Sequence, residues 1–233
     1  MKWRGIGTWS GLVLASLLLA CSSRVPRIGP TAQIWSDPTA VVGVAVAVLP
    51  VAAVYKDGQQ GLLDMAINEA AAGDLAAHLE TLDVSRFRQT ADVVMAKLRA
   101  RGLQTVKIEQ PIDPAQFPER SAGGDGKQFA DRDYSSLERS TGIQRLVLLR
   151  LASVGTTRSY FGFVPTSAPH GYARATGQMI DLQTGQLLWS AASTRRQDVI
   201  DEWDQPPSFP NVDRAIAEAL RIVGKDLAGD LGF

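Results

Sequence analysis

A continuous run over residues 41–48, which contains only Val and Ala apart from Gly43 and ends before Pro50, is the clearest strand signal in the chain. A strand with one solvated face alternates apolar and polar residues, so a continuous run predicts a strand covered on both faces. Residues 146–154 are likewise apolar on both alternating faces, apart from Arg150. We therefore expect two strands in the interior of one sheet.

Helical spacing occurs twice between these strands. Apolar residues recur every three or four positions over 60–82 and again over 87–98, and Gly102 offers a C-terminal cap for the second helix. A short alternating segment over 103–109 then predicts a further strand. Residues 110–132 are rich in Pro, Gly and acidic side chains without an apolar period, so we expect a long loop there.

Two more helices are indicated in the second half of the chain. Ser135 and Glu138 fit a capping box for a short helix that Gly142 ends. Apolar residues recur at intervals of three and four over 216–231, and Asn211 is the expected N-cap of this last helix.

A β-hairpin is predicted from the segments 172–182 and 186–194, with Gly185 able to adopt a positive φ in the turn. Together these elements predict an α/β (α+β) fold. We expect a single mixed-sheet domain of about five strands, with a C-terminal β-hairpin and packed helices.

Aromatic residues gather in the segment 157–172, between a buried strand and the hairpin. They are Tyr160, Phe161, Phe163 and Tyr172, and they lie among Gly and Pro residues without a regular period. Connections of this length are often functional. These side chains either fold back as a small satellite core or remain exposed as anchors for a partner. They form our candidate partner-binding site.

The N-terminus carries an export signal. Lys2 and Arg4 precede an apolar run over 12–20, which is too short to span a bilayer as a helix, and then Cys21, the one cysteine of the chain. Residues 18–21, Leu-Leu-Ala-Cys, resemble the lipobox of bacterial lipoproteins. The resemblance implies that Cys21 receives a diacylglycerol, that cleavage occurs immediately before it and that the new amino group is acylated. The alternatives are an ordinary secretory peptide and an uncleaved anchor.

These features divide the chain into three parts: a lipoprotein signal peptide over 1–20, the lipidated cysteine with a flexible tether over 21–40, and a periplasmic α/β domain over 41–233. Trp35 is expected to pack against the domain. Two or more acyl chains anchor a protein stably to a bilayer. The two serines that follow Cys21 favour, by analogy with lipoprotein sorting, the periplasmic face of the outer membrane.

Composition excludes several functions. With Cys21 lipidated, no thiol remains for a disulfide, a thiolate metal site or a cysteine nucleophile. Removing Lys2 and Arg4 from 24 basic residues, against 24 acidic ones, leaves a formal charge of −2. Since the remaining basic residues form no run in the sequence, we expect no nucleic-acid binding.

Residues 180–190 resemble the D-x-x-T-G-x-x-x-W-S hairpin of bacterial envelope lipoproteins of the CsgG/LpoB-like α/β type, and the similarity also covers the preceding strand. The motif has a physical logic, since Asp181 and Thr184 can bond turn amides, Gly185 can take the left-handed conformation and Trp189 can be buried on the return strand. Such proteins include secretion-channel subunits and activators of peptidoglycan synthases. The resemblance therefore implies non-enzymatic work in the envelope.

Candidate catalytic chemistry is sparse. His78 and His170 are far apart in sequence, and the chain has neither a Gly-x-Ser-x-Gly elbow nor a His-Glu-x-x-His helix. We assign no catalytic residue, metal ligand or cofactor. A pair of loop carboxylates could still serve a glycosidase. The candidates are Glu109, Asp113, Asp131, Asp133, Asp198, Asp201, Glu202 and Asp204.

The sequence therefore predicts a membrane-anchored periplasmic lipoprotein that acts as a non-enzymatic binding or scaffold component with an envelope protein partner. One alternative is a peptidoglycan- or glycan-processing hydrolase that uses loop carboxylates. Another is an oligomeric CsgG-like secretion channel subunit. That role needs long alternating strands, and Pro165 and Pro169 interrupt the candidate segment 158–176.

Overall fold

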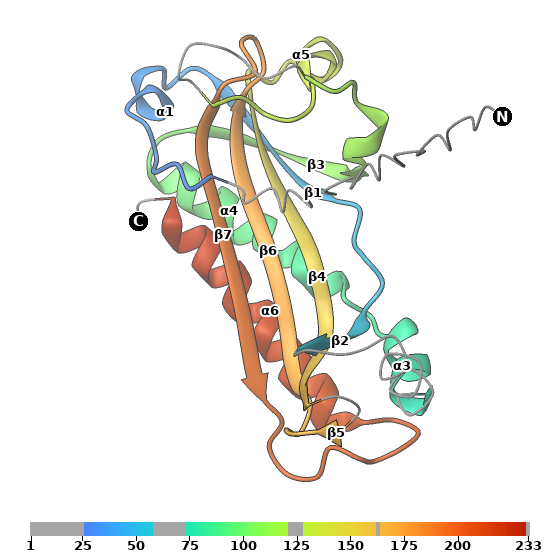
Figure 1. Cartoon of the computed structure of the whole chain (residues 1–233). Coiled ribbons are helices and arrows are strands. Elements are labelled where there is room, and N and C mark those ends of the chain that lie inside the picture. The colour runs from blue at the N-terminus through green and yellow to red at the C-terminus, as the bar shows by residue number, and fades with distance from the viewer. Residues whose placement is uncertain (1–25, 58–72, 121–127, 162–163, 232–233) are drawn as a thin grey trace, which may run out of the picture.

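The chain forms one mixed sheet with two long helices against it (Figure 1). The computed structural model describes residues 26–57, 73–120, 128–161 and 164–231. Among these residues the sheet has seven strands, five of them in the order β3-β1-β4-β6-β7, while β2 and β5 each pair with β4. The strands are β1 Val41–Ala47, β2 Ala53–Asp57, β3 Gln104–Ile112, β4 Arg145–Phe161, β5 Val164–Pro165, β6 His170–Asp181 and β7 Leu187–Asp198.

Strand directions agree with the predicted mixed sheet. β1 pairs in parallel with both β3 and β4, while β4, β6 and β7 pair antiparallel. The expected α/β fold with a C-terminal hairpin is thus confirmed. The hairpin is longer than predicted, because β6 and β7 have 12 residues each.

Helices α4 and α6 cover one face of the sheet, and Figure 1 shows α6 running along the long strands. The helices are α1 Gln33–Ser36, α3 Gly73–Glu80, α4 Gln89–Ala100, α5 Ser135–Thr141 and α6 Pro210–Asp230, with 3-10 turns η1 Ser85–Arg88 and η2 Pro114–Gln116. Of the helix predicted over 60–82, residues 73–80 are helical and 60–72 lie outside the described residues.

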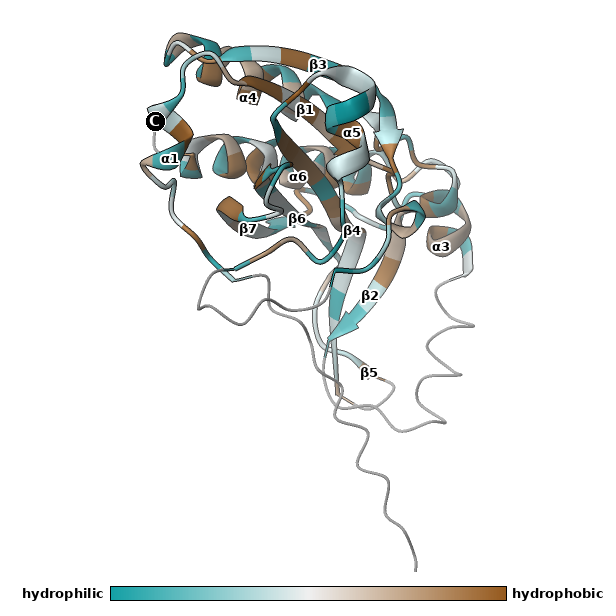
Figure 2. Ribbon diagram, turned by 90° about the horizontal axis from the view of Figure 1, so that it is seen from above, coloured by the Kyte–Doolittle hydropathy of each residue, from teal (hydrophilic) through white to brown (hydrophobic). Residues whose placement is uncertain are grey.

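The main core lies between these helices and the sheet. Val94 and Leu98 of α4 and Ile216 and Val223 of α6 are fully or almost fully buried against apolar side chains of the sheet, among them Trp189. β1 is buried from its second residue onward, as its continuous apolar run predicts. Figure 2 shows the apolar residues of β1 and β4 at the centre of the view.

A second core cluster fills the opposite face of the sheet at one end. Leu146 of β4 and Ile180 of β6 pack there with Tyr134 and Ile143, and Ile28 and Leu137 lie against them half-buried. Helix α5 and the chain before it supply the cover. Along the rest of this face, no helix of the described residues covers β4, β6 and β7.

Segment 28–40, which we assigned to the tether, packs on the domain instead. Ile28 and Ser190 exchange two backbone hydrogen bonds of 2.9 and 3.0 Å at the edge of β7. Ile34 is fully buried. The buried guanidinium of Arg145 donates to the backbone oxygens of Ile34 and Gln33 at 2.8 and 3.2 Å. The folded domain therefore begins about 13 residues before the expected boundary.

The expected end of α5 at Gly142 is confirmed, because this glycine is the C-cap with φ of 73°, but both expected N-caps are wrong. Helix α5 begins at Ser135, and the carboxylate of Asp133 accepts its backbone N–H at 3.0 Å, because an Asx turn one residue earlier competes with the capping box. Helix α6 begins at Pro210, which suits the first helical position because proline has no N–H to lose. Asn211 lies inside the helix, and its amide donates to the backbone oxygen of Glu202 at 2.8 Å.

The two predicted loops contain more regular structure than expected. β3 continues to Ile112. The described remainder of 110–132 includes η2 and two isolated β-bridges, one between Glu119 and Arg132 and one between Phe129 and Gln186. Segment 157–172 is not a free loop, because β4 runs to Phe161 and β6 begins at His170. The backbone N–H and C=O groups of this segment form hydrogen bonds because β4 pairs with β5 and β6, and the side-chain pattern of the sequence does not show this pairing.

Candidate functional site

A hollow lies on the outer side of the helical layer, between α4 and α6. It encloses about 540 Å³, a size typical of ligand sites. Val93, which is 48 % exposed, lies on its α4 side, and Leu220, Gly224 and Ala228 line its α6 side. Gly224 brings the two helices together, because a Cβ there would stand 2.5 Å from the Thr90 hydroxyl oxygen.

Basic side chains surround this apolar hollow. Arg86, Lys97, Arg221 and Lys225 contribute to its lining, and no carboxylate does. Arg221 forms a bidentate ion pair with Glu218, with both N–O distances at or below 2.7 Å. The hydrogen bonds and the charge of the guanidinium lower the pKa of Glu218. Arg86 and Lys225 add positive charge to the rim of the hollow.

Arg86 also lines two neighbouring hollows. One of about 380 Å³ runs toward Asp83 and Asp213, and another of about 330 Å³ runs toward Asp198 and Glu218. The three hollows together follow the outer side of α6, so we name them the α4–α6 groove. It can accommodate an extended or helical segment rather than only a small molecule.

The aromatic candidates do not form one cluster. Phe161 is 82 % exposed at the end of β4. Tyr160 is half-buried. The ring of Tyr172 packs in a tilted arrangement on Tyr55 of β2, with the ring centroids 5.3 Å apart, so Tyr172 belongs to the packing of the sheet. Phe163 lies outside the described residues. Phe161 is therefore the exposed member of this set, whereas Tyr172 packs against Tyr55, and the partner-binding role stays a prediction.

The hairpin residues adopt a compact turn. The carboxylate of Asp181 accepts from the backbone N–H and the hydroxyl of Thr184, both at 2.8 Å. Gly185 has φ of 75°, and its N–H donates to the backbone oxygen of Asp181 at 2.7 Å. Trp189 is fully buried and donates through Nε1 to Asp230 of α6 at 3.2 Å.

The register of the return strand differs from simple alternation. Met179 faces Trp189 while Ile180 faces Leu187, so Leu188 is an extra residue in β7. This bulge moves Leu187 to the second core cluster, on the face opposite Trp189. Regular alternation would have placed Leu187 on the same face as Trp189, and the bulge prevents this.

Each histidine has a structural partner. His78 Nε2 lies 2.8 Å from Asp213 and its ring packs at 5.4 Å on Phe209, which ties α3 to the start of α6. His170 Nδ1 lies 3.0 Å from Asp198 across β6 and β7. The two histidines sit on different elements with different carboxylates.

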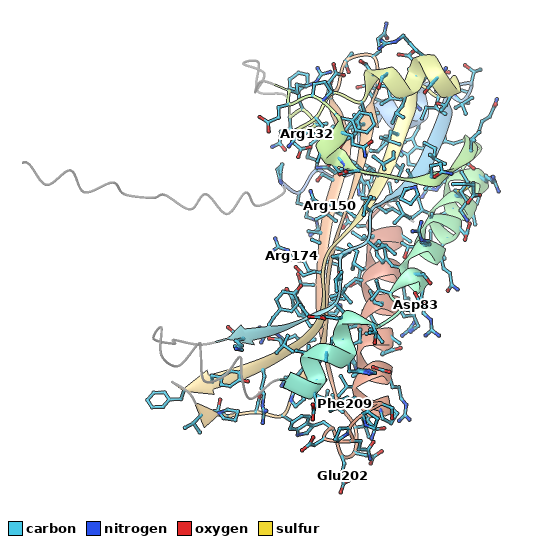
Figure 3. The ribbon with its side chains drawn as sticks, turned by 90° about the vertical axis from the view of Figure 1, so that its right-hand side faces the viewer. Asp83, Arg132, Arg150, Arg174, Glu202 and Phe209 are labelled. Atoms are coloured by element: carbon cyan, nitrogen blue, oxygen red, sulfur yellow. The ribbon has the colours of Figure 1, made fainter. Side chains whose placement is uncertain are left out.

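The candidate carboxylates separate into two groups. Figure 3 labels Arg132 and Glu202 at opposite ends of the molecule, so Asp131 and Asp133, on either side of Arg132 in the chain, lie far from Glu202. Asp113 caps η2 by accepting from Ala115. Backbone and side-chain hydrogen bonds from Ser135, together with Arg120, lower the pKa of Asp133. Within the described part of the chain, no three potential metal ligands converge.

Cys21 and its lipobox lie outside the described residues, so lipidation stays a prediction. In the described ranges no helix is long and apolar enough to cross a membrane.

The α4–α6 groove was missed by sequence reasoning, because its walls are more than 100 residues apart in the chain. Val93 on the outer side of an otherwise polar helix surface was the one available signal.

Comparison with known proteins gave structural matches alone. No protein-family model matches the sequence, and no curated protein matches it. The PelC dodecamer from Paraburkholderia phytofirmans is similar at 13% identity and a TM-score of 0.40, over 89% of this chain and 98% of that chain. Lipoprotein GNA1162 from Neisseria meningitidis is similar at 12% identity and a TM-score of 0.31, over 81% and 99%. A minor lipoprotein from Acinetobacter baumannii is similar at 13% identity and a TM-score of 0.28, over 82% of this chain and 86% of that chain.

Proposed function

We propose that this chain is a lipid-anchored protein of the bacterial envelope that binds a protein partner and catalyses no reaction. The lipobox at Cys21 supports the anchor, and the periplasmic face of the outer membrane is the expected location. Both histidines are paired with carboxylates, and Asp113 and Asp133 are engaged in caps, which favours a binding role.

The α4–α6 groove carries the proposal of a protein partner. In the part of the groove that Val93 lines, the hollow of about 540 Å³, the floor is apolar and the rim is basic, so the best ligand for this part is an acidic amphipathic segment. The apolar side of such a segment would cover Val93 and Leu220, and its carboxylates would approach Arg86 and Lys225. Burial of one valine side chain at an interface is worth about 1.5 kcal/mol or more, which is at least tenfold in affinity.

Substitution of the anchor residue is the first test. Cys21→Ala should abolish incorporation of labelled palmitate and leave the precursor uncleaved by the lipoprotein signal peptidase, because the chain has no other thiol. Ser22→Ala is the matched control and should be acylated and processed normally. Palmitate on the Cys21→Ala chain would refute the anchor.

The groove is tested with two equally exposed valines. Val93 in the groove and Val106 on β3 are both 48 % exposed. After detergent extraction, the Val93→Asp chain should recover an envelope partner at least about tenfold less well than the wild type, because a carboxylate repels an acidic segment and resists burial. The Val106→Asp chain should recover it normally.

The recovered protein must then bind the purified chain directly, with an affinity that falls as salt is added. Equal losses in both variants would indicate a general defect, and melting curves of each variant detect it. Unchanged recovery by the Val93→Asp chain would overturn the groove as the binding site.

A further inference from the structure

The face of the sheet opposite α4 and α6 carries a surplus of positive charge. Figure 3 labels Arg132, Arg150 and Arg174 along this side. Arg150 faces Thr176 and Arg174 faces Ser153 across the β4–β6 pair, so the two arginines lie on one face, on neighbouring strands. We name this surface the open face.

Two of its arginines lack an ion pair. Arg132 pairs with Glu119 at 3.2 Å, and Arg196 of β7 pairs with Asp57 at 2.6 Å. Arg150 and Arg174 are exposed, and among the described residues neither has an ion pair or a hydrogen bond. Charges left without a partner on an exposed sheet face suit an anionic ligand spread over a surface.

The charges around Tyr134 show where the arginines lie relative to the second core cluster. Burial raises the pKa of the Tyr134 phenol, and Asp131 raises it further, while Arg150 and Arg132 oppose the shift. Both guanidinium groups therefore lie near the point where the open face meets the cover of the second core cluster.

An apolar projection accompanies the arginines. Phe161 and Val164 are cross-strand partners at the β4–β5 pair, and they are 82 % and 49 % exposed. Figure 3 shows β2 and the β4–β5 end projecting away from α4 and α6, to the side on which Arg150 and Arg174 lie. Aromatic and aliphatic side chains at a projecting tip are suited to the interfacial region of a bilayer.

The attachment point lies on the same side. Ile28 pairs with Ser190 at the edge of β7 and packs on the second core cluster, which is on the open-face side of the sheet. Seven peptide units separate Cys21 from Ile28, so their Cα atoms are at most about 25 Å apart. A lipid on Cys21 would therefore hold this side of the domain close to the head groups.

We propose that the open face is the membrane-contacting surface of this protein, with Arg150 and Arg174 bound to the phosphates of anionic lipid head groups and Phe161 and Val164 at the interface. Its orientation rests on the proposed anchor at Cys21. The α4–α6 groove, on the opposite side of the sheet, then faces the periplasm and is free to receive its partner. One short connection and two arginines thus orient the whole domain.

The experiment measures which side of the mature chain lies near the lipid. Thr194→Cys, on β7 opposite Arg174, and Ala96→Cys, on α4, each supply one thiol for a fluorescent label, since an acylated Cys21 is blocked. The chain is reconstituted in vesicles of phosphatidylcholine, with or without phosphatidylglycerol, that contain a head-group quencher. We expect strong quenching of the label at 194 with phosphatidylglycerol, weak quenching at 96, and loss of the difference in high salt.

Removal of the arginines tests the chemistry. Each basic residue near an anionic surface contributes about fivefold to binding, so Arg150→Gln with Arg174→Gln should weaken surface association roughly 30-fold. The control, Arg86→Gln with Lys225→Gln, removes the same charge from the groove side and should leave quenching at 194 unchanged. Equal quenching at both positions, or no effect of the arginine changes, would overturn the proposal.

Mass spectrometry of the same preparation separates this result from that of the anchor. A chain without acyl groups contradicts the proposed function. The open face is then tested by adding that chain to the same vesicles, where it should still bind those with phosphatidylglycerol and require Arg150 and Arg174. Retention that is independent of the two arginines would contradict the open face alone.

Discussion

Trp189→Ala should lower the free energy of unfolding by about 3–5 kcal/mol, the range for a large aromatic removed from a core. The side chain is fully buried between the hairpin and α6. Gly177 provides the space for the indole, because a Cβ at that position would lie 2.4 Å from the ring. The substitution also removes the hydrogen bond to Asp230, which anchors the last turn of α6. Denaturant unfolding of the mature chain, followed by circular dichroism, measures the loss.

Trp203→Ala is the matched control. Trp203 is half-buried, with the Arg158 guanidinium 4.9 Å from its ring centre, so its removal should cost less than about 2 kcal/mol. A loss below about 1 kcal/mol for Trp189→Ala would mean that the indole is not packed as described. A change in the denaturant slope would instead indicate an altered denatured state.

The sheet interior could be predicted from the sequence because its signal is local. The Val/Ala run of β1 and the apolar start of β4 are buried by neighbours on both faces, which a continuous apolar run requires. The D-x-x-T-G turn is also local, since Asp181 bonds a residue three positions away. In these segments, side-chain pattern and backbone conformation have the same cause.

Features held by backbone pairing left no such pattern. Residues around Ile28 pair with β7 through main-chain groups in a segment that includes Gly29 and Pro30, so no periodicity announces the contact. The extra residue Leu188 is equally invisible, because the bulge shifts register without changing composition. Single-sequence reasoning therefore placed the domain boundary too late, and it gave no sign of the face on which Leu187 lies.

The candidate surfaces were not predictable, because each combines distant segments. Val93 and Leu220 meet only when α4 and α6 lie together on the sheet. Arg150 and Arg174 become neighbours only through the β4–β6 register. In sequence, Arg150 was an exception in an apolar run, and the structure turns that exception toward solvent.

Gly171→Ala should lower the free energy of unfolding by about 2 kcal/mol or more, because the added methyl group overpacks the contact between β6 and α6. A Cβ at this position of β6 would stand 2.3 Å from the Ala215 carbonyl carbon and 2.6 Å from the Ile216 backbone nitrogen of α6. These are main-chain atoms of a long helix, so they cannot rotate away as a side chain can. Relief requires α6 to move away from the sheet, which opens the core around Ile216.

Gly229→Ala in α6 is the control, since it adds the same methyl group where no atom lies within 4 Å. It should raise stability by about 0.5–1 kcal/mol, because alanine favours the helix over glycine. Thermal and denaturant unfolding of both variants should therefore shift in opposite directions. If both variants were equally stable, close contact between β6 and α6 at Gly171 would be refuted, because the same added atom distinguishes a filled contact from an empty one.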